Sequence, residues 1–202
     1  MSLDHSPVNW FDFVAVIVIL LGISKGRKNG MSVELLGMLQ WITIVVAGAF
    51  LYRPLGDKFS QACQLGHALG YTAMYVVIAI AVKTIFSMIK KGIGQRLLEA
   101  NMFGRAEFYL GMIAGAVRFA CVMLAGLALL NAPYYTPGEL AKNKAAQIDL
   151  YGSTFFPGMG VIQQQIFKES LLGSAVKENA DIMLVVATKP ERRSPSQKKA
   201  SL

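Results

Sequence analysis

The sequence predicts an all-α, polytopic membrane protein with four transmembrane helices, a short peripheral C-terminal helical region and a disordered tail. Apolar residues make up 54% of the chain and charged residues only 16%, whereas soluble globular domains contain roughly 25% charged residues. The apolar residues also occur in runs separated by short polar clusters, while a soluble core would spread them over amphipathic faces. These two observations favour membrane spans over a soluble fold.

Four apolar runs contain most of the hydrophobic residues. A transmembrane helix needs roughly 20 such residues, and the runs at 31–52, 67–89 and 108–130 meet this length. The first run, at 8–24, is shorter, but it lacks the basic leader and the small-residue cleavage site of a signal peptide, so we expect a retained span. Residues 1–130 therefore form a predicted membrane domain of four helices.

The last third of the chain is more polar. Pro and Gly residues predict turns after the fourth run, and apolar pairs between Val161 and Val176 recur at a drifting helical spacing that favours a surface helix. We expect residues 131–180 to form an extramembrane or interfacial helical region. Residues 181–202 end in a segment rich in Ser, Pro, Lys and Arg, which is typical of a flexible basic tail.

Basic residues gather just beyond the apolar runs. Seven lie in the loops after the first and third runs, and only two, Arg53 and Lys58, lie in the loop after the second. The positive-inside rule therefore predicts both termini on the non-cytoplasmic side. This placement also explains the net charge of +8 without nucleic acid, because no helix-turn-helix pattern or zinc-knuckle spacing accompanies it. We expect the lipid bilayer, and no nucleic acid, as a partner.

The residues that usually carry catalysis or bind metals are sparse. The two histidines and two cysteines show no metal-ligand spacing. The sequence also lacks a nucleophile elbow, an HExxH helix, a Gly-rich phosphate loop and a carboxylate cluster near a histidine. We therefore expect neither an enzyme nor a protein that holds a metal or a small-molecule cofactor.

Four charged residues interrupt the apolar runs: Asp12, Glu34, Lys83 and Arg118. A central Arg costs about 2.5–3.5 kcal/mol on insertion scales, so each charge needs a partner, water or a route to the interface. A rise of about 1.5 Å per residue places Arg118 near mid-membrane within reach of Asp12, and places Glu34 and Lys83 on the inner half. We predict the pairs Asp12–Arg118 and Glu34–Lys83. The alternatives are that Lys83 snorkels to the interface, or that the charges line an ion or solute path.

Glycines recur at helical spacing in two places. Gly22, Gly26 and Gly30 follow one another every four residues, which favours either close helix packing or a flexible loop within GRKNG. The fourth run carries one stripe of small and charged residues, namely Glu107, Gly111, Gly115, Arg118, Val122 and Ala125. Such a stripe packs poorly against lipid, so it predicts a bundle interior or a subunit interface.

In their order along the chain these motifs resemble the CvpA family, the colicin V production proteins. NWFD at 9–12 and KGRKNGMSVELL at 25–36 are similar to the opening motifs of that family, and FGRAEFYLGMIAGAVR at 103–118 is similar to its fourth span. YGSTFFPG at 151–158 resembles a cluster that follows the last span. The matching positions are Asp12, Gly26, Gly30, Glu34, Gly111, Gly115 and Arg118.

The resemblance implies a multi-pass protein of the bacterial inner (cytoplasmic) membrane that acts in colicin V or toxin production or export and in cell-envelope physiology. We expect a non-enzymatic role through helix-mediated assembly, with itself or with other membrane proteins. A channel-like or transport component, in which the charged span residues line a path, is the alternative.

Overall fold

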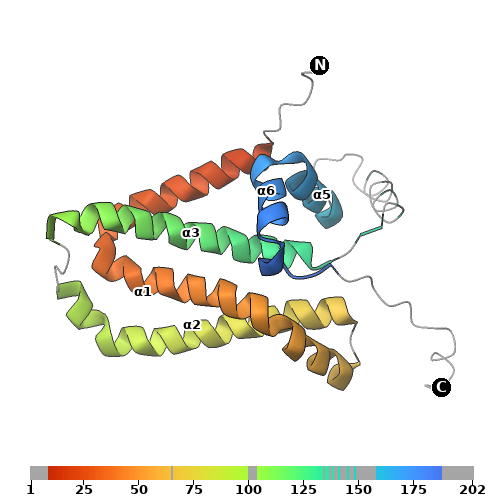
Figure 1. The fold of residues 1–202 in the computed structure, drawn as a ribbon, viewed down its shortest axis with the longest axis horizontal. Coiled ribbons are helices and arrows are strands. Elements are labelled where there is room, and N and C mark those ends of the chain that lie inside the picture. The colour runs from red at the N-terminus through yellow and green to blue at the C-terminus, as the bar shows by residue number, and fades with distance from the viewer. Residues whose placement is uncertain are drawn as a thin grey trace, which may run out of the picture.

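The structure is a computed structural model that describes residues 9–64, 66–99, 104–133 and 158–187, together with isolated positions between 135 and 148. Within these residues the elements are all helical (Figure 1). Three helices are long and apolar enough to cross a membrane, namely α1 (Trp10–Cys63), α2 (His67–Glu99) and α3 (Glu107–Asn131). The short 3-10 turn η1 (Gly104–Ala106) leads into α3.

Helix α1 is a hairpin rather than one straight rod. Gly30 interrupts it with φ 75° and ψ 169°, outside the helical region. The residues of α3 that contact α1 first come closer to Glu107 as α1 proceeds and then move away from it. The contacts are Gly22/Gly115, Gly26/Gly111, Gly30/Glu107 and Gly37/Arg118. The part before Gly30, which we call the N-arm, therefore runs antiparallel to α3, and the part after it, the C-arm, runs parallel to α3. Figure 1 shows the two arms in red and orange.

The reversal makes the length of α1 compatible with a membrane. A straight helix of 54 residues would be about 80 Å long, but the hydrocarbon core of a bilayer is only about 30 Å thick. The two arms overlap the predicted runs 8–24 and 31–52, and both helical segments extend beyond these runs. The N-arm stays helical as far as Gly30, and the C-arm continues past Pro54 to Cys63 because α2 packs against its last turns.

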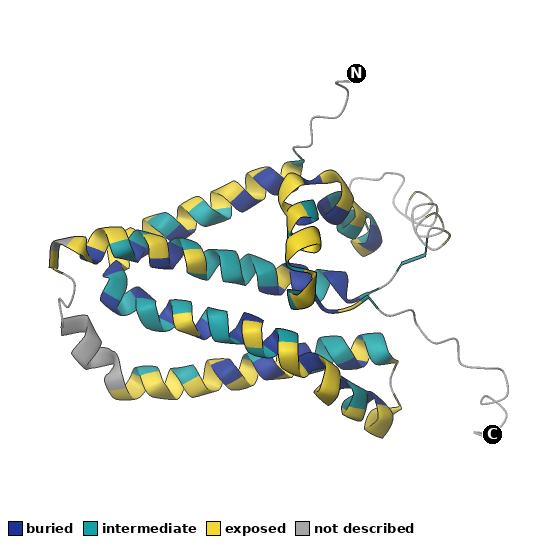
Figure 2. Ribbon diagram, in the orientation of Figure 1, coloured by how far each residue is buried: buried dark blue, intermediate teal, exposed yellow. Residues whose placement is uncertain are grey.

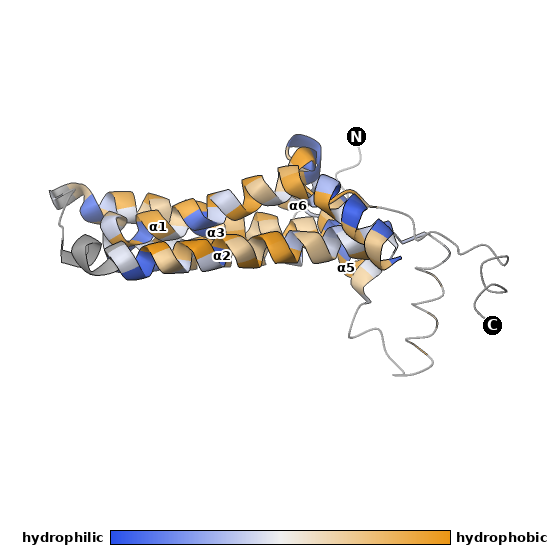
Figure 3. Cartoon of the chain, turned by 90° about the horizontal axis from the view of Figure 1, so that it is seen from below, coloured by the Kyte–Doolittle hydropathy of each residue, from blue (hydrophilic) through white to orange (hydrophobic). Residues whose placement is uncertain are grey.

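The C-arm lies between α2 and α3 (Figure 1). Gly48 and Gly56 on this arm give room to the rings of Tyr75 and Tyr71 on α2, since a Cβ at either glycine would collide with the facing ring. Tyr75 is only 1% exposed as a result. Large apolar side chains on the outer faces remain exposed, such as Ile80 at 59% (Figures 2 and 3). Apolar outer faces are what the hydrocarbon core of a membrane requires.

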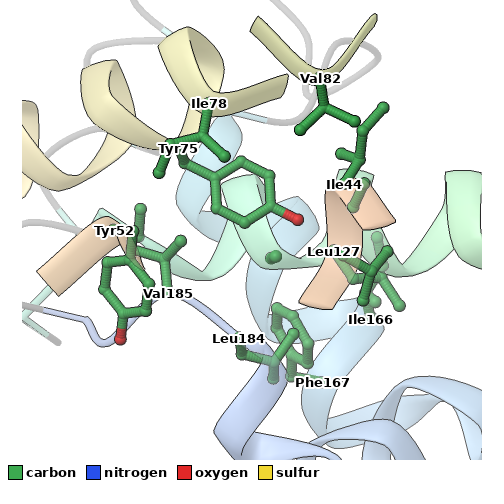
Figure 4. Close-up of a cluster of buried hydrophobic side chains, with 14 of the residues drawn as sticks. Ile44, Tyr52, Tyr75, Ile78, Val82, Leu127, Ile166, Phe167, Leu184 and Val185 are labelled. Atoms are coloured by element: carbon green, nitrogen blue, oxygen red, sulfur yellow. The ribbon is translucent and has the colours of Figure 1, made fainter. Parts of the chain in front are cut away.

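Three short helices cover the end of the bundle that is distant from Gly30. They are α5 (Met159–Glu169), α6 (Leu171–Asn179) and the 3-10 turn η2 (Asp181–Met183). Leu184 and Val185, which follow η2, join the buried hydrophobic cluster of the bundle (Figure 4). The expected start of a flexible tail at residue 181 is therefore too early, because two apolar residues directly after η2 are buried.

Candidate functional site

The most distinctive feature of the bundle is a buried ion pair. Arg118 Nη1 on α3 lies 2.7 Å from Glu34 Oε2 on the C-arm. Glu34 is only 1% exposed, and the Arg118 side chain is 27% exposed. The second oxygen of Glu34, Oε1, is buried without a hydrogen-bond partner among the described residues. Loss of either partner would leave an uncompensated charge in an apolar interior, so this pair holds the C-arm against α3.

The predicted pairs Asp12–Arg118 and Glu34–Lys83 are both wrong. That prediction depended only on the depth of each backbone position in the membrane, and it did not include the direction of the side chains. A helical side chain leans toward the N-terminus of its own helix, and the N-terminus of α3 is the end beside Gly30. The long Arg118 side chain therefore extends toward Glu34 and passes Gly37, where a Cβ would lie 3.2 Å from Nη1.

Asp12 caps the start of two helices. It accepts a hydrogen bond of 2.8 Å from the backbone N–H of Asn9, at the start of α1. It also accepts bonds of 2.9 Å from the Ser170 hydroxyl, 3.2 Å from Leu171 N–H and 2.9 Å from Leu172 N–H. The first amides of a helix have no partner within it, and a carboxylate is also favoured by the helix dipole there. Asp12 thereby fixes α6 to the N-arm.

Lys83 stands apart from these groups. It lies on an exposed part of α2 and makes no ion pair within the described part of the chain. Its snorkelling to the membrane interface, one of the alternatives above, stays a prediction.

The glycines form a close contact between the N-arm and α3, which we call the glycine seam. A Cβ at Gly26 would collide with the carbonyl of Gly111, and a Cβ at Gly115 would collide with the carbonyl of Gly22. Gly26 is helical, so the flexible-loop alternative is wrong for it, whereas Gly30 has the non-helical conformation of the reversal. The stripe on α3 faces α1, with Gly111, Gly115 and Ala125 buried, which identifies it as bundle interior.

Glu107 supports the reversal at Gly30. Its Oε1 accepts a 2.6 Å hydrogen bond from the backbone N–H of Ser32, in the first turn of the C-arm, and Glu107 is 8% exposed. A Cβ on Gly30 would lie 2.8 Å from the same oxygen. Position 30 therefore requires glycine for two reasons. Its backbone conformation is disfavoured for residues with a side chain, and a side chain there would collide with the Glu107 carboxylate.

Sequence reasoning missed two polar residues beside the ion pair. Lys90 Nζ on α2 donates a 3.2 Å hydrogen bond to Gln40 Oε1 on the C-arm, and Gln40 is 8% exposed. The Lys90–Gln40 bond and the Arg118–Glu34 pair therefore engage the same arm, at positions six residues apart. The signal available in the sequence was Gln40, a polar residue within the apolar run 31–52.

The site therefore consists of polar groups that connect helices: Glu34, Arg118, Gln40 and Lys90 inside the bundle, with Glu107 at one end and Asp12 at the other. In the described part of the chain, no group of three His, Cys, Asp or Glu side chains could hold a metal ion. The motif at 151–157 lies outside the described residues. The arrangement can hold helices in a fixed register and keep a small set of charges away from lipid.

Comparison with known proteins gives one match. The family described as Colicin V production protein matches residues 11–161. No curated protein and no solved structure matches the chain. The matched range contains the ion pair, the glycine seam and the Gly30 reversal.

Proposed function

The chain belongs to the colicin V production protein family, and on this premise we propose that it is a non-enzymatic protein of the bacterial inner membrane that supports the production or export of colicin V or a related toxin. It acts as a fixed helical bundle that assembles with itself or with other membrane proteins. The observation that carries this proposal is the Glu34–Arg118 pair, because it joins α3 to the C-arm of the same chain through a direct contact between opposite charges.

The other acidic residues favour the same interpretation. Asp12 connects the N-arm to α6, and Glu107 connects α3 to the C-arm. Each buried carboxylate is thus engaged with a different element of the same chain. A transport cycle that moved these helices apart would break charge-assisted bonds in an apolar medium, which is costly. A bundle that stays in one conformation and presents its outer faces to partners fits these contacts better.

We also infer four crossings. The two arms of α1, together with α2 and α3, are the crossing segments, and the reversal at Gly30 separates the first two. The basic residues Arg27 and Lys28 precede the reversal, and Lys90 and Lys91 lie near the end of α2 that approaches it (Figure 1). The positive-inside rule puts this end of the bundle in the cytoplasm, and both termini on the opposite side.

The role in toxin production is tested in a colicin V-producing strain that lacks this chain. We expect less secreted colicin V, measured as the activity of the culture supernatant against a sensitive strain, and recovery when the wild-type chain is supplied. Gly26→Leu, which separates the glycine seam, is expected to restore less secretion than Gly126→Leu, whose position has open space around it. Unchanged secretion in the strain without the chain would contradict the proposed role.

A channel-like or transport component is the second candidate, favoured by the polar side chains of Gln40 and Lys90 beside the ion pair. It is tested by ion flux in proteoliposomes, with Lys83→Ala as the control for removal of a charge from an exposed position. The fixed-bundle proposal predicts no selective flux. Selective flux that Arg118→Ala abolishes, with the protein still assembled, would contradict it and support the channel.

A further inference from the structure

Two cavities lie along the same side of the glycine seam. The first, of about 370 Å³, lies between the N-arm and α3 and is closed on one side by α6. Its walls are apolar throughout: Val16, Ile19 and Leu20 from the N-arm, Met123 and Leu124 from α3, and Leu172 from α6. The volume is within the range of roughly 300–1,000 Å³ that small-molecule sites occupy. Nothing in this lining could recognise a polar ligand.

The second cavity, of about 770 Å³, lies at the Gly30 end of the same two helices and has a different chemistry. The N-arm contributes Ser24, Arg27 and Lys28, and α3 contributes aromatic side chains. Two cations and a hydroxyl thus point at one space from successive turns of one helix. Their spacing of three and four residues places them on one helical face.

Residue spacing places the linings of the two cavities next to each other along the N-arm and α3. On the N-arm, Leu20 lines the apolar cavity, and Ser24 and Lys28, at four-residue intervals, line the basic one. On α3, Met112 lines the basic cavity, and Ala120, eight residues further on, lines the apolar one. Residues four apart on a helix are neighbours on its surface. The two linings therefore adjoin along the same two helices, and we call the two cavities together the trough.

The trough exists because the seam is close at one end and wide at the other. Gly22, Gly26 and Gly115 bring the two backbones into contact near the reversal. Between Trp10 and Gly22 the N-arm contains no glycine, and toward its N-terminus it diverges from α3 in the direction of α6 (Figure 1). Between Met112 and Ala120, α3 carries the small side chain of Ala116, and the Phe119 ring packs against Gly22 of the N-arm.

We propose that this trough binds one phospholipid with an anionic headgroup. Arg27 and Lys28 bind the phosphate, with the Ser24 hydroxyl as a further donor, and an acyl chain runs along the trough into the apolar cavity beneath α6. Because α1 and α3 are long and apolar enough to cross a membrane, lipid is the medium that meets this face of the bundle. The phosphate groups of phospholipids lie at the membrane interface, which is also where the basic residues that flank a transmembrane helix lie.

The dimensions of the trough fit a single lipid chain. The middles of the two cavities are about 10 residues apart on the N-arm and about 14 residues apart on α3, which corresponds to about 15–21 Å at a rise of about 1.5 Å per residue. Half of the hydrocarbon core of a bilayer is about 15 Å thick. A chain that begins at a headgroup beside Lys28 therefore ends in the apolar cavity. Neither cavity alone supplies both the charge and the apolar length.

The proposal is tested with the full-length chain purified from membranes and reconstituted in nanodiscs that contain phosphatidylglycerol and phosphatidylcholine. Native mass spectrometry after release from the discs counts the lipids that stay bound. We expect one retained phosphatidylglycerol per chain and little phosphatidylcholine. Arg27→Ala/Lys28→Ala is expected to weaken retention about 30-fold, because each of the two basic residues near a lipid surface contributes about 1 kcal/mol. Lys25→Ala/Lys91→Ala removes the same charge from exposed positions that line neither cavity, and is expected to retain the lipid.

Filling the apolar cavity tests the acyl chain separately. Ala120→Trp is expected to abolish retention. Leu20→Trp is also expected to abolish retention. Leu20 is 57% exposed, so a larger side chain fits there without repacking of the bundle. Circular dichroism and elution volume show whether each variant keeps its fold. Equal loss in the Lys25/Lys91 control, retention by both Trp variants, displacement by inorganic phosphate alone, or a second copy of the chain in place of lipid would each overturn the proposal.

Discussion

At the scale of single residues, three acidic side chains hold this bundle together, and each does so through a group on another element. Glu34 pairs with Arg118, Asp12 caps α6, and Glu107 binds the backbone of the C-arm. An apolar medium raises the cost of leaving any of these groups unpaired. The charges within the apolar runs therefore act as structural connectors, although the runs themselves gave no sign of which partner each charge selects.

Arg118→Ala is expected to destabilise the protein by about 3–5 kcal/mol, since it leaves Glu34 buried without its counter-charge. The measurement is the thermal or denaturant midpoint in detergent. Lys83→Ala removes a charge that makes no ion pair in the described residues, and should leave the midpoint within about 0.5 kcal/mol of wild type. The exchange Glu34→Arg/Arg118→Glu should recover part of the loss. Equal midpoints for Arg118→Ala and Lys83→Ala would contradict the role of the pair.

Asp12→Ala is expected to release α6 from the N-arm, because the amides of Leu171 and Leu172 lose their acceptor. A helix cap contributes about 0.5–2 kcal/mol, so hydrogen exchange within α6 should accelerate by about tenfold. Asp57→Ala is the matched control, since Asp57 accepts from the Tyr71 hydroxyl at the α2 side of the bundle and does not touch α6. Unchanged exchange in α6 would show that the apolar contacts alone hold it.

At the scale of helical elements, close packing depends on where glycine stands. Gly26→Leu forces the N-arm away from α3, because even a Cβ there meets the backbone of Gly111. Overpacking of this kind typically costs about 1–3 kcal/mol, and the thermal midpoint in detergent measures it. Gly126 on α3 has no neighbouring atom within 4 Å of an added Cβ, so Gly126→Leu should be tolerated. A similar loss in both variants would mean that glycine acts only through the unfolded state.

The reversal of α1 depends on the backbone conformation of Gly30. Gly30 has a backbone conformation that is essentially restricted to glycine, so Gly30→Ala should cost about 1–3 kcal/mol. The same experiment on Gly92, which has open space around it, separates backbone strain from the general effect of replacing a glycine. Equal destabilisation by Gly30→Ala and Gly92→Ala would show that the turn does not depend on this residue.

The apolar runs and the glycine spacing predicted the helices well, but their connections less well. The seam follows from the four-residue glycine repeat, because that spacing aligns small residues on one face. The single-residue reversal could not be predicted, since GRKNG has the composition of an ordinary loop. The pairing of Arg118 with Glu34 requires knowledge of which helix end lies beside Gly30. The contacts of Asp12 with α6 and of Glu107 with Ser32, and the burial of Leu184 and Val185, likewise join segments that are distant in sequence.

At the scale of the whole molecule, the proposed four crossings place the reversal and α6 on opposite sides of the membrane. Single cysteines introduced at Lys28 and Lys177, in a chain whose Cys63 and Cys121 are replaced by serine, test this arrangement in intact cells. A membrane-impermeant thiol reagent should label position 177 from outside the inner membrane and label position 28 only after the membrane is opened. Labelling of both positions from the same side would contradict the topology.

The hydrogen bonds between Asp12 and α6 form late in the synthesis of the chain. The two groups are about 160 positions apart in the chain, so the N-arm must wait for α6 to leave the ribosome before the bundle closes. At about 5–20 residues per second, translation from the end of α3 to α6 takes a few seconds. During that interval the nascent protein is an open bundle in the bilayer, and its apolar cavity can fill from the surrounding membrane before α6 arrives to cover it.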